Sequence, residues 1–111
     1  MARPPICVIS NAEMLQKFRD HDFLGRLQRG ELTQRLISDR PAPPYPWLQV
    51  GSRSQIIAYV DTNDVRVAEL HQYLQPDGTI GASGLPDPKR LLIDELLYIV
   101  VKPDLGQRRH H

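Results

Sequence analysis

Several features that would mark out a class of protein are scarce in this chain of 111 residues. Its single cysteine, Cys7, excludes an intrachain disulfide and the cysteine-based zinc motifs, so a reducing compartment is expected. No run approaches the ~18 apolar residues of a membrane span, and the apolar run near the N-terminus is too short for a signal peptide. We therefore expect a cytoplasmic protein with no membrane partner.

Charge of one sign is also lacking. The formal net charge of +1 provides no overall field to draw in nucleic acid, so such binding would need a local basic patch. One group of basic residues lies in the first half of the chain, but acidic residues interleave with it, as on an ordinary solvated helix face. Its members are Lys17, Arg19, Arg26, Arg29 and Arg35. Nucleic acid is therefore only weakly indicated as a partner.

Proline is what the chain has in excess, with ten residues. The prolines of residues 40–47 lack backbone donors and fix φ, which predicts an extended connector rather than a helix or a central strand. Its sequence formally matches R-x-x-P-x-x-P, the ligand pattern of Src-homology-type adaptor domains. Tyr45 and Trp47 favour a different interpretation, in which the connector packs onto its own domain. We expect one domain, residues 1–111, with a flexible tail at 103–111.

The part before the connector is expected to be helical over about residues 10–38. Ser10 and Glu13 match a capping box, which predicts a helix start. Apolar residues then recur at helical spacing, but Gly25 and Gly30 weaken the run and favour two or three short helices. Residues 1–9 are either a short strand or an apolar lead into the first helix.

The part after the connector, about residues 48–102, is expected to form a sheet. Residues 54–60 and 65–74 read as a β-hairpin around a polar turn, although a helix over 64–75 is the alternative. The apolar segment 90–101 is either a hairpin turning at Asp94-Glu95 or a helix that gives way to a strand; its residues favour strands. The predicted fold class is α+β, with N-terminal helices packed on a small twisted antiparallel sheet formed by the C-terminal half.

If 65–74 is a strand, its alternation places Glu69, His71 and Tyr73 on one face. An imidazole that titrates near neutrality, a carboxylate and a phenol are together suited to acid–base chemistry, so these are the candidate catalytic residues. The competing interpretation is an exposed sheet face whose histidine is satisfied by its neighbours.

A second candidate site binds anions. The glycine-rich loop at residues 81–84 contains Ser83 and is followed by Lys89 and Arg90, which together offer backbone amides and two cations. The prolines at positions 86 and 88 remove donors and break the phosphate-loop pattern, so a rigid ordered loop is the alternative. No cofactor is indicated and no metal site is expected, because His21 lacks a second histidine at ligand spacing.

The segment from His71 to Lys89, HQYLQPDGTIGASGLPDPK, resembles a stretch of short uncharacterised bacterial proteins that share the pattern HQYL-PDG-IGASG-PDPK. The resemblance covers roughly residues 54–98. It implies no function and assigns no role to any residue.

The sequence favours a small non-enzymatic binding or interaction module. The apolar excess of residues 91–101 and the edges of a short sheet predict a homodimer or higher homo-oligomer. The alternative is an enzyme that acts on a phosphate-containing substrate, of which RNA is one example. In this enzyme His71 would be the acid or base, and Lys89 or Arg90 would stabilise negative charge.

Overall fold

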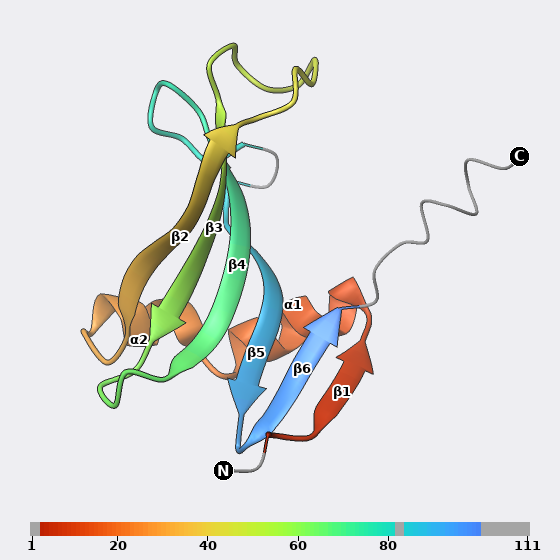
Figure 1. Cartoon of the computed structure of the whole chain (residues 1–111), viewed down its shortest axis with the longest axis vertical. Coiled ribbons are helices and arrows are strands. Elements are labelled where there is room, and N and C mark those ends of the chain that lie inside the picture. The colour runs from red at the N-terminus through yellow and green to blue at the C-terminus, as the bar shows by residue number, and fades with distance from the viewer. Residues whose placement is uncertain (1–2, 82–83, 101–111) are drawn as a thin grey trace, which may run out of the picture.

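A computed structural model describes residues 3–81 and 84–100, in which two short helices lie on one face of a single sheet (Figure 1). The elements are β1 (Ile6–Ile9), α1 (Asn11–Asp20), α2 (Phe23–Gln28), β2 (Thr33–Pro41), β3 (Arg53–Val60), β4 (Arg66–Leu74), β5 (Asp87–Ile93) and β6 (Leu96–Val100). The sheet has the order β1-β6-β5-β4-β3-β2. β1 runs parallel to β6, and the other neighbours are antiparallel.

The predicted α+β fold class is wrong. The protein is a six-stranded mixed sheet with two short helices, and two of the strands come from the N-terminal half. The expected helical part, 10–38, ends early, because Gly30 adopts φ +80° just after α2 and the chain then turns into β2. The spacing of Leu36 and Ile37 suits a helix, but both residues belong to β2, which pairs with β3 instead. Their side chains are 54% and 38% exposed, so no buried helix face holds them.

The predicted start of the first helix is confirmed. The Ser10 Oγ accepts from the Glu13 amide at 3.1 Å, and the Glu13 carboxylate accepts from the Ser10 amide at 3.2 Å. This box satisfies two donors that the first turn leaves without partners. The residues before it, left open between two interpretations, form the edge strand β1.

Both predicted hairpins are present. Residues 66–74 form strand β4 against β3, so the helix alternative for this segment is excluded. The C-terminal hairpin turns at Asp94 and Glu95, whose φ values of 50° and 66° define a two-residue turn with the twist that hairpins prefer.

The core lies between the helices and one face of the sheet. Met14 and Phe23 are fully buried at 0% exposure, and Phe18 stacks on Phe23 with ring centroids 5.5 Å apart. The strands contribute side chains that point toward the helices, among them Ile57, Tyr59, Ala68, Leu70 and Leu91. Full burial of each large apolar side chain stabilises the fold by ~1.5–3 kcal/mol.

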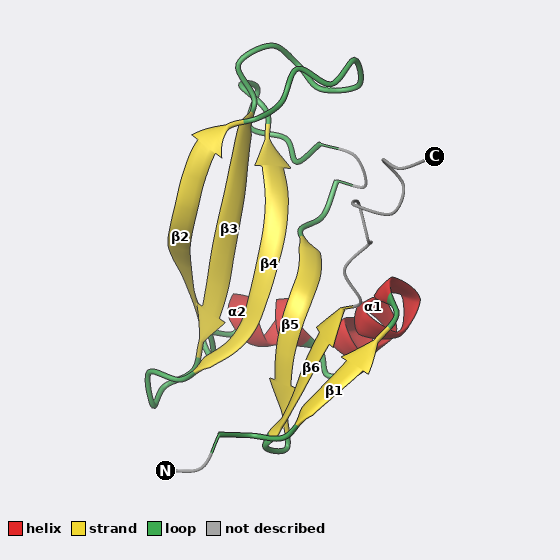
Figure 2. Cartoon of the chain, turned by 45° about the vertical axis from the view of Figure 1, so that its right-hand side comes forward, coloured by secondary structure: helices red, strands yellow, loops and turns green. Residues whose placement is uncertain are grey.

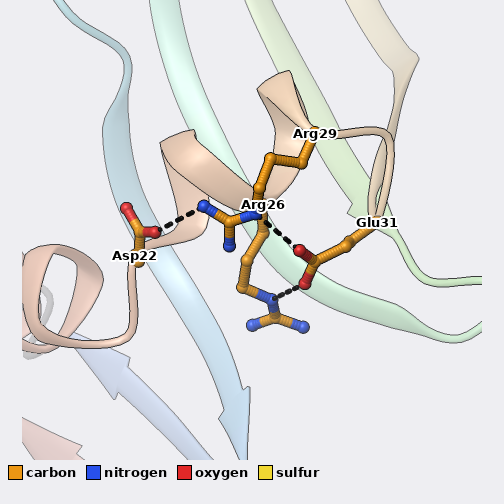
Figure 3. Close-up of polar contacts among 4 residues, drawn as sticks. All are labelled: Asp22, Arg26, Arg29 and Glu31. Atoms are coloured by element: carbon orange, nitrogen blue, oxygen red, sulfur yellow. Dashed lines mark hydrogen bonds and ion pairs between the residues drawn. The ribbon is translucent and has the colours of Figure 1, made fainter.

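Ion pairs brace α2 against the turn that leads into β2 (Figure 3). Arg29 Nη1 lies 3.0 Å from Asp22 Oδ2, and its Nε lies 2.6 Å from Glu31 Oε2. These two carboxylates raise the pKa of Arg29 above its usual value. Arg26 reaches Glu31 more loosely, at 3.8 Å, and its guanidinium covers the Phe23 ring.

Figure 2 shows both helices on the same side of the sheet. Within residues 3–81 and 84–100, no helix covers the opposite side, which we call the open face. Neither helix is long and apolar enough to cross a bilayer. The predicted tail at 103–111 lies outside the residues that the structure describes.

Candidate functional site: an aromatic patch on the open face

Strand β4 carries the candidate catalytic residues on the open face. From Ala68 onward its side chains alternate, so Ala68 and Leu70 enter the core while Glu69, His71 and Tyr73 point the other way. Across the sheet, His71 lies opposite Ile56 on β3 and Asp87 on β5.

The three candidate residues do not act as one group. The rings of His71 and Tyr73 meet edge to face, with centroids 4.6 Å apart. Glu69 instead lies opposite Ala58 and Arg90, one step along the ladder. Its carboxylate is not among the charges that shift the pKa of His71, so the predicted role for Glu69 in raising that pKa lacks support.

The imidazole has a different polar partner, Ser54. The Ser54 hydroxyl and His71 Nε2 are 2.7 Å apart, and both residues are half-buried. Sequence reasoning missed Ser54 because its place depends on the hairpin register: it lies opposite Tyr73 and therefore diagonally from His71 on the same face. Counting back from the predicted polar turn would have found it.

The surroundings of His71 favour its neutral form. Burial lowers the pKa of His71 below 6.5, the Lys89 ammonium lowers it further, and the Asp87 carboxylate acts in the opposite direction. Lys89 Nζ and Asp87 Oδ2 are themselves 2.7 Å apart, so the two charges near the imidazole largely compensate each other.

Four rings gather beside one another and form what we call the aromatic patch: Tyr45, Trp47, His71 and Tyr73. Tyr45 and Trp47 stack with centroids 5.0 Å apart and planes 8° apart. Tyr73 meets both edge to face, at 6.0 Å from Tyr45 and 5.5 Å from Trp47. Trp47 remains 53% exposed and Tyr45 39% exposed, so the patch presents aromatic surface to solvent.

The loop that carries Tyr45 and Trp47 is anchored at its far end. The Gln49 amide donates to Gln75 Oε1 at 3.0 Å, and Gln49 Nε2 donates to Asp77 Oδ2 at 2.7 Å. Hydrogen bonds from Thr79 and Gln49 lower the pKa of Asp77 to about 2. The predicted packing of the connector onto its own domain is thus confirmed, although its first residues, Arg40 and Pro41, belong to β2.

The predicted anion-binding loop is described only in part. Ser83 lies outside the described residues. Lys89 and Arg90, expected to follow the loop, belong to strand β5, and Lys89 pairs with Asp87. The Gly81 amide donates to the Tyr73 carbonyl at 2.8 Å, so it does not point toward a phosphate. What remains of the prediction is two cations on a strand beside the aromatic patch.

A shallow hollow of about 220 Å³ lies on the sheet beyond Arg90. Its lining combines basic, acidic and apolar side chains: Arg66, Val67, Ala68, Glu69, Arg90, Leu92 and Leu97.

Among residues 3–81 and 84–100, no cluster of three histidine, cysteine or acidic side chains could hold a metal ion.

No protein-family model, curated protein or solved structure matches the chain. Function must therefore be inferred from the aromatic patch and from the open face around it.

Proposed function

We propose that this protein is a small non-enzymatic binding module and that the aromatic patch is its ligand site. The observation that supports this most strongly is the stacked pair Tyr45–Trp47, which is held against Tyr73 while both of its residues remain more than a third exposed. Rigid, exposed aromatic rings supply large contact area at low entropic cost. Anchoring of the loop through Gln49 keeps these rings in place before a ligand arrives.

A second candidate function is an enzyme acting on a phosphate-containing substrate such as RNA, with His71 as acid or base. The hydrogen bond between Ser54 and His71 favours it, because a hydroxyl within reach of an imidazole is a typical nucleophile–base arrangement. Lys89 would place positive charge near developing negative charge. We rank it second because Glu69 does not interact with His71, and no described group orients the imidazole from its other nitrogen.

The two functions can be distinguished by experiment. Trp47 is the single tryptophan of the chain and lies in the aromatic patch, so its fluorescence emission reports on binding there. Titration with a ribo-oligonucleotide, a neutral oligosaccharide and a proline-rich peptide should shift the Trp47 emission with at least one of them. His71→Ala should weaken that binding without abolishing it, because the stacked Tyr45–Trp47 pair does not depend on His71. Turnover of bis(4-nitrophenyl) phosphate or of RNA that disappears in a folded His71→Ala variant would instead support the enzyme.

We further propose that the protein works in the cytoplasm and pairs with a second copy through the free edge of β1. The outer residues Ile6 and Val8 are 59% and 57% exposed and lie opposite Leu97 and Ile99 on the open face. β1 has no charge, proline or bulge to block pairing, whereas the other edge strand, β2, has all three.

A further inference from the structure

Basic side chains outnumber acidic ones on the open face, although the chain as a whole is almost neutral. The strand register places five basic residues there, Arg35, Arg40, Arg66, Lys89 and Arg90, with the acids Glu69 and Asp87. Arg35 pairs with Asp64 and Lys89 with Asp87. Within the described part of the chain, Arg40, Arg66 and Arg90 form no ion pair. Glu69, opposite Arg90, forms none either, so the unpaired groups of this face are three cations and one carboxylate. This leaves a net excess of positive charge.

These cations flank the aromatic patch on two sides. Arg40 on β2 lies opposite Ser54, which in turn lies opposite Tyr73, so the three form one row across neighbouring strands. On the other side of β4, Lys89 lies close enough to His71 to lower its pKa, and Arg90 follows it along β5. A ligand seated on Trp47 and Tyr73 therefore has positive charge on either side of it.

We infer that the open face binds single-stranded nucleic acid, which deepens the proposed binding function and rests on it. Exposed rings beside cations are the arrangement that such ligands need: unpaired bases stack on aromatic side chains while basic residues meet the phosphates. In this arrangement a base stacks on Trp47 or Tyr45, and the backbone runs between Arg40 and the Lys89–Arg90 side. Paired bases are already stacked within a duplex and cannot use the patch in this way.

Charge complementarity is what favours nucleic acid over other ligands of aromatic surfaces. Neutral sugars and proline-rich peptides also bind exposed tryptophan and tyrosine, but they gain nothing from three unpaired arginines. A polyanion gains from each of them, and its affinity falls as salt competes for the phosphates.

The inference can be tested by fluorescence anisotropy with labelled oligothymidine and oligouridine of about twelve nucleotides, within the usual site sizes for such surfaces. We expect the affinity to fall as salt is added. An unlabelled duplex of the same length should be a poor competitor of the labelled oligomer. Trp47→Ala should weaken binding roughly tenfold or more, the effect of losing one stacked base. Comparison of the two oligomers shows whether the natural ligand is DNA or RNA.

The arginine variants test the placement of the backbone. Arg40→Gln and Arg90→Gln should each reduce the slope of log affinity against log salt by about 0.7, the share of one neutralised phosphate on a single strand. The matched control is Arg19→Gln, which removes an exposed arginine of α1 on the helical side and should leave affinity and slope unchanged.

Three kinds of result would overturn this inference but not the binding-module function. One is an affinity that does not respond to salt or that Arg19→Gln lowers as much as Arg40→Gln. Another is duplex bound as tightly as single strands. The third is saturation of the Trp47 signal by the oligosaccharide or the peptide alone, which would leave the binding-module function standing. Turnover that depends on His71, with no binding of any probe at Trp47, would remove both proposals.

Discussion

Burial favours the neutral form of His71, whose polar neighbours come from the strands on either side of β4. Ser54 on β3 contacts its Nε2, and Asp87 and Lys89 on β5 act on it with opposite signs. Residue patterns indicate that His71 and Tyr73 share a face. They do not reveal the compensation by Asp87, because it depends on the register between β4 and β5, which are separated by a loop and shifted by a bulge.

The pKa of His71 should be below 6.5 when its ring is titrated by NMR. Lys89→Gln should raise this pKa, since the ammonium disfavours the imidazolium, whereas Asp87→Asn should lower it further. A folded-state pKa below the unfolded value means that the unfolded chain binds the proton first on acidification. His71 therefore reduces stability as pH falls through 6.5 toward the folded pKa and has no such effect above this window. A pKa above 6.5 in the folded protein would contradict this account.

Gly81 lies directly against the loop that carries the aromatic pair. A Cβ at this position would lie 2.5 Å from Leu48 Cδ2, so the loop before β3 packs directly against the backbone after β4. Gly81→Ala should displace Leu48, loosen Trp47 and shift its emission to longer wavelength. In a Leu48→Ala background the same substitution should cost less stability, because the clash is gone. Equal costs in both backgrounds, measured by urea unfolding, would show that Leu48 is not the obstacle.

At the scale of elements, sequence reasoning is correct where the signal that defines an element is local. The capping box of α1 and the turn at Asp94-Glu95 each depend on residues a few positions apart. The few apolar residues of β2 have helical spacing and so predict a helix wrongly. The actual partner of this strand, β3, joins it only after a long loop, and almost all of β2 is exposed, so no buried alternation marks it as a strand.

Substitutions in the turn of the C-terminal hairpin should increase the stability of the fold. Asp94 and Glu95 both adopt positive φ, which side chains other than Asn, Asp and Gly disfavour. Replacing them with the pair that this turn prefers, Asp94→Asn with Glu95→Gly, should raise the free energy of unfolding by about 1 kcal/mol. Glu95→Ala is the control, since alanine at positive φ gains nothing. A double variant no more stable than Glu95→Ala would argue against a two-residue turn of this type.

At the scale of the whole molecule, the sheet has two unlike edges. β2 carries charges, a bulge and Pro41, while β1 is uncharged and lies beside the apolar side chains of β6. Composition and the apolar excess after residue 90 point to self-association. They do not indicate which edge would pair, because the uncharged edge strand β1 lies far from residue 90 in the sequence.

Light scattering should detect a species of twice the 12.7 kDa chain mass at micromolar concentration. Val8→Lys should shift it to the monomer by placing a charge on the pairing edge. Leu36→Lys is the matched control, because Leu36 is similarly exposed, at 54%, but lies on the protected edge β2. A wild-type protein that scatters only as a monomer, or variants that dissociate equally, would exclude pairing through β1.

The parallel ladder between β1 and β6 joins the first and the last of the described strands, with Ile6 opposite Leu97. During synthesis β1 therefore cannot form this ladder until β6 has left the ribosome. Such non-local closure slows folding and leaves an apolar strand exposed for longest. A nascent or truncated chain that lacks β6 would present β1 and the outer side of β5 together, so surveillance by chaperones and proteases should act on incomplete copies of this protein far more than on finished ones.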